Sequence, residues 1–108
     1  MSLELPAAIA AYFDADRQDG AAIARCFAPE GAVKDEGLLH RGHDAIADWK
    51  AKASSRYNYA SDPVAVRRDG NRLIVTARVT GDFPGSPVDL RYAFTLKGER
   101  IALLEIVP

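Results

Sequence analysis

The sequence has little cysteine and no excess of charge of one sign. Cys26 is the single cysteine among 108 residues. A fold held together by intrachain disulfide bonds is therefore excluded, and a reducing compartment is the simplest expectation. The 14 lysines and arginines nearly balance the 15 aspartates and glutamates, for a formal net charge of −1. Nucleic-acid and membrane-surface partners both need a concentrated basic patch, so the composition argues against both.

Long apolar runs are also lacking. No stretch approaches the roughly 18 consecutive apolar residues of a membrane-spanning helix. The opening segment MSLELPAAIAAYF has no basic residue and contains Glu4 and Pro6, so it predicts a helix and not a signal peptide. We expect a cytoplasmic protein. Hydrophobic residues make up 48% and charged residues 27%, which is ordinary for a globular protein, and residues 1–108 are expected to form one domain.

Apolar residues in the first half of the chain recur at helical spacing. The stripe in AAIAAYF predicts a first helix, which an aspartate-glycine pair ends. Ile23, Cys26 and Phe27 repeat the i, i+3, i+4 spacing, which predicts a second, short helix that Asp19 caps. In the third helix acidic residues come early and basic residues, Lys50 among them, come late, as the helix dipole favours. We expect helices over residues 6–18, between Asp19 and Pro29, and over residues 43–55, with extended pieces at 32–35 and 38–41.

From residue 57 onward the pattern has a period of two, which is typical of strands. An aspartate-glycine pair at 69–70 predicts a hairpin. Helices followed by an antiparallel meander predict an α+β fold, with three helices on one face of a curved sheet. The last strand, IALLEIV, is apolar on both sides, with Ile101, Leu103 and Val107 together on one of them. Because a sheet covered on one face only should be polar on the other, we expect a homodimer formed through the sheet.

Three segments of the sequence resemble a known superfamily. They are AAYFDADRQDGAAIARCFAPEGAVKDEG, HRGHDAIADW and the run that begins FPGSPVDLRY. In order and spacing they resemble the nuclear transport factor 2-like superfamily, and within it the SnoaL-like proteins, named after a polyketide cyclase. The resemblance covers essentially the whole chain. It implies a cone-shaped, cystatin-like fold, in which three N-terminal helices pack in a curved antiparallel sheet, with a pocket at the open end and dimers through the sheet.

The superfamily contains isomerases, cyclases, dehydratases, hydrolases and binding proteins, so the fold alone implies no activity. Ketosteroid isomerase is the member with the clearest chemistry. The resemblance places its general base on Asp35 and its oxyanion-stabilising tyrosine on Tyr12. Its second oxyanion donor falls near Leu90, while the nearest carboxylate, Asp89, is one position away and therefore belongs to the other strand face. The resemblance implies a site that lacks this second donor, which argues against steroid isomerase activity itself.

Asp35 is the first candidate for catalysis. A carboxylate desolvated at the mouth of an apolar cone becomes a stronger base, as proton abstraction requires. The alternative is a surface residue paired with Lys34 or Arg41. Tyr12 could donate a hydrogen bond to a substrate oxygen, or it is a core residue of the helix stripe. We expect His40 to line the pocket near Asp35 as a second proton-handling group.

Aromatic side chains provide the expected pocket wall. Trp49 lies on the buried stripe of the third helix, where it is pocket wall, plain core or both. His40 and His43 form an H-x-x-H pair across a glycine, which is not the helical i, i+4 pair of zinc enzymes, so no metal site is expected. The expected ligand-binding residues are Trp49, Tyr57, Tyr59, Leu90, Tyr92 and Phe94.

These residues predict proton transfer without a cofactor, of the isomerase or cyclase type, on a small apolar carbonyl compound. Asp35 would act as the base, with Tyr12 or His40 at the carbonyl oxygen. The alternative is a non-catalytic domain of the same fold that binds a small molecule or acts as a dimeric scaffold. The position of Asp35 favours the enzyme, whereas Leu90 in place of a second oxyanion donor favours the binding domain.

Overall fold

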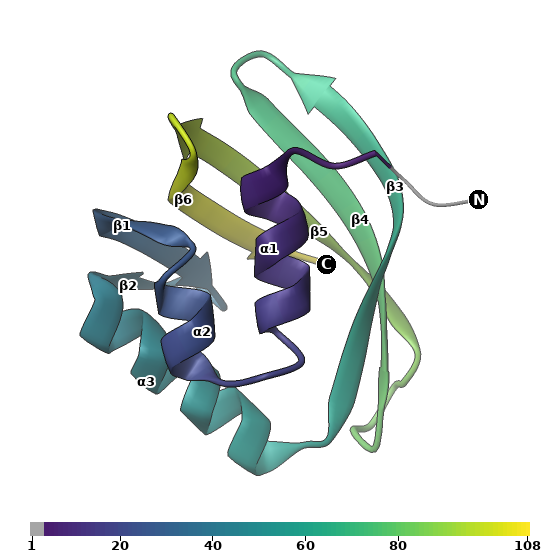
Figure 1. Ribbon diagram of the computed structural model, residues 1–108. Coiled ribbons are helices and arrows are strands. Elements are labelled where there is room, and N and C mark those ends of the chain that lie inside the picture. The colour runs from purple at the N-terminus through teal and green to yellow at the C-terminus, as the bar shows by residue number, and fades with distance from the viewer. Residues whose placement is uncertain (1–3) are drawn as a thin grey trace.

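The structure is a computed structural model that describes residues 4–108, and within this range it has three helices and six strands. Figure 1 shows one strongly curved sheet, with α1 lying against its inner side and α2 and α3 near its β1 edge. The predicted α+β class is confirmed. The elements in chain order are α1 (Ala7–Ala15), α2 (Gly20–Ala24), β1 (Phe27–Asp35), β2 (Leu38–Arg41), α3 (His43–Arg56), β3 (Tyr59–Asp69), β4 (Arg72–Gly81), β5 (Val88–Lys97) and β6 (Arg100–Val107).

The strands follow the order β2-β1-β6-β5-β4-β3 across the sheet. Four neighbouring pairs are antiparallel, but β1 and β6 run parallel. The prediction of a wholly antiparallel sheet is therefore wrong at this pair. A parallel pair needs a long connection, and here the connection includes α3 and the strands β2 to β5. The pairing sets Asp35, at the end of β1, opposite Ile106 near the C-terminus.

An aromatic cluster fills the space between α1 and the sheet. Tyr12 packs edge-to-face on Phe94, with ring centroids 5.5 Å apart, and Phe13 packs in the same way on Tyr92, at 5.2 Å. Such pairs favour a defined angle between the rings. The aromatic stripe of α1 therefore faces the sheet as its helical spacing predicts, and its packing holds Tyr12 in one position.

Helix α2 is shorter than its apolar pattern indicates. It begins after Asp19, whose side chain accepts a hydrogen bond from the Ala22 backbone N–H at 2.8 Å, as expected for an N-cap. It ends at Ala24, and Phe27 begins β1 instead of completing a helical stripe. Phe27 pairs with Ile101 of β6, and both side chains are fully buried. Burial between two strands thus outweighs the local helical periodicity.

The last strand does not alternate regularly. A register shift after Thr95 interrupts the pairing of β5 with β6. As a result Ile101 and Leu104 are both fully buried in the core, while Leu103 and Val107 are 36% and 40% exposed. The prediction that Ile101 shares the outer face with Leu103 and Val107 is wrong, because such an irregularity moves a side chain to the opposite face. The outer face is less apolar than the sequence pattern indicates.

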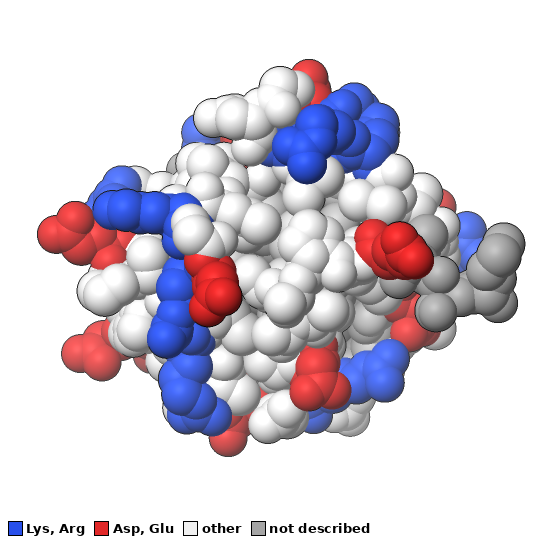
Figure 2. Space-filling model, turned by 45° about the horizontal axis from the view of Figure 1, so that its top comes forward, with Lys and Arg blue, Asp and Glu red and all other residues white. Residues whose placement is uncertain are grey.

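Charge is spread without a dominant sign on the face drawn in Figure 2. Basic and acidic side chains both lie around the edge of this face and leave an uncharged centre. None of the helices within residues 4–108 is long and apolar enough to cross a membrane.

Candidate functional site

A cavity of about 240 Å³ lies between the concave face of the sheet and the helices α1 and α3. Its wall combines six aromatic side chains with three carboxylates and several aliphatic groups. Most of the predicted site residues meet in this cavity, although they come from five different elements and the loops between them. The lining residues are Tyr12, Asp16, Asp35, Glu36, Trp49, Ala53, Tyr57, Tyr59, Val79, Phe83, Val88, Leu90, Tyr92 and Ile106.

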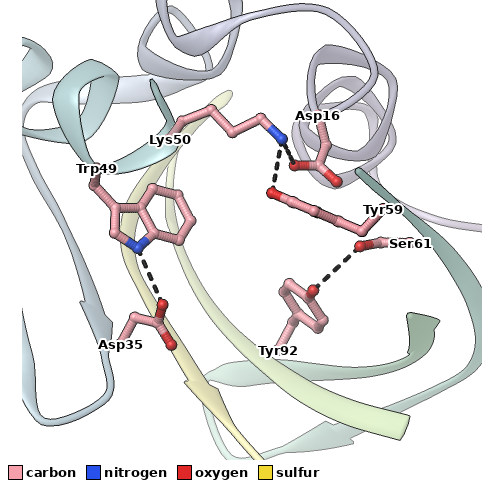
Figure 3. A network of polar contacts seen from close by, with 7 residues as sticks. All are labelled: Asp16, Asp35, Trp49, Lys50, Tyr59, Ser61 and Tyr92. Atoms are coloured by element: carbon pink, nitrogen blue, oxygen red, sulfur yellow. Dashed lines mark hydrogen bonds and ion pairs between the residues drawn. The ribbon is translucent and has the colours of Figure 1, made fainter. Parts of the chain in front are cut away.

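Asp35 is half-buried at the end of β1 and lines the cavity. The indole Nε1–H of Trp49, on α3, donates a hydrogen bond to its Oδ2 at 3.0 Å, as Figure 3 shows. Lys34 and Arg41, the alternative partners, bond to other groups instead. The carboxylate is therefore held by a neutral donor beside an aromatic wall.

Tyr12 belongs to the core and to the cavity at once. Its side chain is 2% exposed and packs among the aromatic rings, yet it also lines the cavity. Burial raises the pKa of the Tyr12 hydroxyl well above its usual value of 10.0, and the neighbouring Tyr92 and Asp16 add to this. The hydroxyl stays protonated at neutral pH and has no side-chain hydrogen-bond partner among the described residues. It is available as a donor to a bound molecule.

A buried ion pair borders the cavity, and the sequence pattern did not indicate it. Nζ of Lys50 is 2.8 Å from Oδ1 of Asp16, and the two side chains are 4% and 8% exposed. The same ammonium donates to the Tyr59 hydroxyl at 2.8 Å, as Figure 3 shows. From the sequence, Lys50 was expected only to be one of the late basic residues of the third helix that match the helix dipole. The aspartate that follows the α1 stripe is the only signal in the sequence that could have indicated a buried partner.

The ionisation of this group follows from its contacts. Burial lowers the pKa of the Lys50 ammonium, but the hydrogen bonds to Asp16 and Tyr59 outweigh burial, so the net pKa lies above the usual 10.5. Burial also raises the pKa of Tyr59, as does the charge of Asp16, although Lys50 acts in the opposite direction. At neutral pH the lysine is therefore charged and the phenol is protonated.

The three predicted ligand-binding residues of β5 contribute differently to the cavity. The hydroxyl groups of Tyr92 and Ser61 are 3.4 Å apart, and burial raises the pKa of Tyr92. Leu90 adds an aliphatic surface to the cavity, and its neighbour Asp89 bonds to Arg78 at 3.0 Å. Phe94, which was expected to contact the ligand, is fully buried in the core and is not part of the cavity wall.

The two histidines lie in different surroundings. His40 lines a second hollow of about 250 Å³, which shares Asp35, Trp49 and Tyr57 with the first cavity. Its ring centroid is 6.2 Å from that of Trp49. His43 instead contacts the backbone carbonyl of Phe27 through Nε2 at 2.9 Å. Within residues 4–108 no group of three or more His, Cys, Asp or Glu side chains could hold a metal ion.

A larger hollow lies elsewhere. A groove of about 920 Å³ runs between α1, α2 and the β5–β6 turn, and alanines of both helices line it together with charged residues such as Arg25, Glu99 and Arg100. It is more open than the smaller cavity, and none of the described residues that line it is a buried polar or charged side chain. The smaller cavity is the better candidate site, because a few directed polar groups in an apolar wall are what a specific ligand needs.

Comparison with known proteins identifies the family. The sequence profile of the SnoaL-like domain matches residues 7–103. The chain belongs to the SnoaL-like domain family. A search of curated proteins gave no significant match.

Solved structures share the fold of this SnoaL-like domain. A proposed polyketide cyclase from Sinorhizobium meliloti is 45% identical, with a TM-score of 0.89 over 95% of both chains. A protein of ketosteroid isomerase-like fold from Catenulispora acidiphila, solved with trimethylamine, is 21% identical, with a TM-score of 0.85 over 97% of this chain and 87% of that one. TerC, co-crystallised with polyporic acid, is 17% identical, with a TM-score of 0.76 over 93% and 85%. The last two show a common fold alone.

Proposed function

We propose that this SnoaL-like domain transfers a proton on a small carbonyl compound, as an isomerase or cyclase does, without a cofactor. The observation that carries the proposal is that the Asp35 carboxylate and the Tyr12 hydroxyl line one small aromatic cavity. A general base and a hydrogen-bond donor in one water-poor site are the two groups that enolisation needs. The proposed polyketide cyclase that is 45% identical to the chain supports this class of chemistry.

The proposed reaction needs only a base and a hydrogen-bond donor, and residues of the chain supply both. Asp35 removes a proton from the carbon next to the carbonyl group. The electron pair of the C–H bond forms a carbon–carbon double bond, and the π electrons of the carbonyl group move to its oxygen. Tyr12 donates a hydrogen bond to the resulting enolate oxygen. The protonated Asp35 then returns the proton to another carbon. Alternatively, the enolate carbon attacks a second carbonyl group and closes a ring, and the protonated Asp35 gives its proton to the alkoxide oxygen that forms.

The size of the cavity limits the substrate. At about 30 Å³ for each water molecule of a liquid, the 240 Å³ cavity has room for about eight waters. This space suits a compound of one ring, whereas four fused rings would need the neighbouring hollow as well. Trp49, Tyr57 and Tyr59 border both spaces, so a substituent could extend past them toward His40.

Deuterium uptake tests the proposal without knowledge of the product. Cyclohexenones, cyclopentenones and β-diketones are incubated with the protein in deuterium oxide, and NMR measures exchange at the carbon next to the carbonyl group. We expect Asp35→Asn to lower the rate by at least roughly 100-fold, because a positioned base contributes about that much. Glu30→Gln is the matched control, since Glu30 is an exposed carboxylate of β1 that does not line the cavity. Equal rates for wild type and Asp35→Asn would contradict the proposal.

A binding domain without turnover is the second candidate. The aliphatic Leu90, where ketosteroid isomerase-like sites have an oxyanion donor, favours it, as do the aromatic rings that line the cavity. Trp49, the single tryptophan, borders the cavity, so its fluorescence reports a bound compound directly. Saturable fluorescence changes without any deuterium uptake would favour the binding domain. Loss of uptake in Asp35→Asn with unchanged fluorescence titrations would favour the enzyme.

A further inference from the structure

The Tyr59 hydroxyl has one fixed role in its hydrogen bond with Lys50. Nζ of Lys50 lies 2.8 Å from this hydroxyl. An ammonium group has donors only, so the Tyr59 oxygen accepts, and its own proton remains for another acceptor. Figure 3 shows the hydroxyl end of Tyr59 reaching from β3 toward α3, where it meets the Lys50 ammonium.

A molecule in the cavity can accept this proton. Tyr59 and Asp16 both line the cavity, whereas Lys50 is 3% exposed and lies behind them. The Ser54 side chain, which is exposed on α3, lowers the pKa of Tyr59, as a hydroxyl that donates toward the Tyr59 oxygen does, so it does not take up the Tyr59 proton. A ligand oxygen that enters the cavity would offer a better acceptor than a neutral hydroxyl once negative charge develops on it.

The lysine strengthens the donor. A hydroxyl that accepts a bond from a cation becomes polarised, and hydrogen bonds in such a chain reinforce each other where the surroundings exclude water. Asp16 keeps Lys50 protonated and holds it in place, at 2.8 Å, against the tendency of burial to remove the proton. The pair therefore supplies a fixed cation behind the Tyr59 oxygen at no cost of reorganisation during a reaction.

Leu90 lies where the family resemblance places a second hydrogen-bond donor to the substrate oxygen, and its aliphatic side chain cannot donate one. Tyr92 does not fill this place fully, because its hydroxyl already faces Ser61 at 3.4 Å. We infer that Tyr59, polarised by the Lys50–Asp16 pair, is the second hydrogen-bond donor to the substrate oxygen, together with Tyr12. Tyr59 is then a catalytic residue, and Lys50 and Asp16 are positioning residues. The inference rests on the proposed function and specifies its substrate as an enolisable carbonyl compound whose oxygen lies between α1 and β3.

The test measures kcat and KM for deuterium uptake into cyclohexenones. Tyr59→Phe keeps the ring and removes the donor, and we expect it to lower kcat by roughly 100- to 1,000-fold with little change in KM, as the loss of an oxyanion donor does. Ser55→Ala removes an exposed hydroxyl of α3 that donates to the Lys52 carbonyl and does not line the cavity, so it should keep the wild-type kcat. Asp35→Asn serves as the reference for loss of the base.

The neutral double variant Asp16→Asn with Lys50→Gln distinguishes an effect of the ion pair on the Tyr59 hydroxyl from a general disruption of the structure. It should lower kcat when Tyr59 is present and have no further effect on kcat in the Tyr59→Phe background, because the pair acts through that hydroxyl. If Tyr59→Phe does not fold with Lys50 present, the triple variant, which has no unpaired lysine, provides the comparison with the double variant. Circular dichroism confirms the fold of each.

Three outcomes are distinguishable. A large fall in kcat for Tyr59→Phe, with no additional effect of the neutral pair, supports the inference. Wild-type kcat in Tyr59→Phe together with an inactive Asp35→Asn overturns the inference and leaves the proposed function standing. No uptake by the wild type with any compound of the panel overturns both.

Discussion

The indole nitrogen of Trp49 donates a hydrogen bond to the Asp35 carboxylate across 3.0 Å, and this bond joins α3 to the end of β1. A carboxylate has about four lone-pair sites, so one bond at Oδ2 leaves Oδ1 for a substrate proton. The indole also fixes the orientation of the carboxylate, because its ring is held on the helix. Trp49 is thus part of the cavity wall and at the same time the residue that orients the proposed base.

The Trp49–Asp35 bond gives the first prediction. Trp49→Phe keeps an aromatic ring and removes the donor, so Asp35 should sample more orientations. We expect deuterium uptake to fall about tenfold, near the lower end of what a hydrogen bond to a charged group contributes. The comparison of uptake in Trp49→Phe and in the double variant with Asp35→Asn checks the cause. If Trp49→Phe lowers the rate equally in the Asp35→Asn background, the bond to Asp35 is not the reason.

The sequence indicated these two residues separately and for good physical reasons. Trp49 follows from helical periodicity, and Asp35 follows from the family resemblance. Their contact depends on how α3 packs against β1, which no local pattern encodes. The same holds for the parallel pairing of β1 with β6, which sets Asp35 opposite Ile106. Contacts between segments far apart in the chain are the part that sequence reasoning could not supply.

Lys50 illustrates the limit most clearly. Late basic residues on a helix usually face solvent and complement the helix dipole, and Lys52 does so as an exposed partner of Asp48. Lys50 lies two positions earlier, on the face of α3 that points to the core. Its partner, Asp16, is 34 residues away in the sequence. The prediction of a helix at Phe27 was wrong for a similar reason. Phe27 pairs with Ile101 of β6, and this distant contact outweighs its local helical spacing.

The buried pair gives the second prediction. Lys50→Met leaves the Asp16 carboxylate buried without its cation, so we expect the free energy of unfolding to fall by about 3–5 kcal/mol. Lys52→Met is the matched control, because its exposed pair with Asp48 should contribute only about 0.5 kcal/mol. Urea unfolding at neutral pH measures both. Equal losses in the two variants would contradict the burial of the Lys50 charge.

The neutral double variant extends this prediction. When Asp16→Asn and Lys50→Gln are made together, no uncompensated charge remains in the core. The double variant should therefore recover most of the stability that Lys50→Met loses, since a buried ion pair contributes little net stability over a neutral replacement. A double variant less stable than Lys50→Met would contradict this account.

Alkaline stability gives the third prediction. The pKa values of Tyr12, Tyr59, Tyr92 and Lys50 are all raised in the folded protein, the first three chiefly by burial and the last by its hydrogen bonds. A group with a raised folded pKa contributes its full stability below its unfolded value, here near pH 10. That stability is lost as the pH rises through the folded value, so the protein should unfold progressively above about pH 10.

Two signals recorded in parallel check the alkaline prediction. The ultraviolet absorbance of phenolate should rise for the buried tyrosines only together with the loss of the circular dichroism signal. Tyr92→Phe removes one of the responsible groups and should make the free energy of unfolding fall less steeply above about pH 10. Complete ionisation of all four tyrosines in a protein with native circular dichroism would contradict the burial of Tyr12 and Tyr92.

The outer face of the sheet gives the last prediction. Leu103 and Val107 remain 36% and 40% exposed there, and apolar side chains grouped on one face favour association. We predict a homodimer at micromolar concentration, formed through this face. Leu103→Lys with Val107→Lys should give a monomer, because two buried ammonium groups without partners would oppose contact. Ala51→Lys, at an exposed residue of α3 outside the sheet, is the control and should leave the dimer intact. Sedimentation velocity decides, and a wild-type monomer at this concentration would refute the prediction.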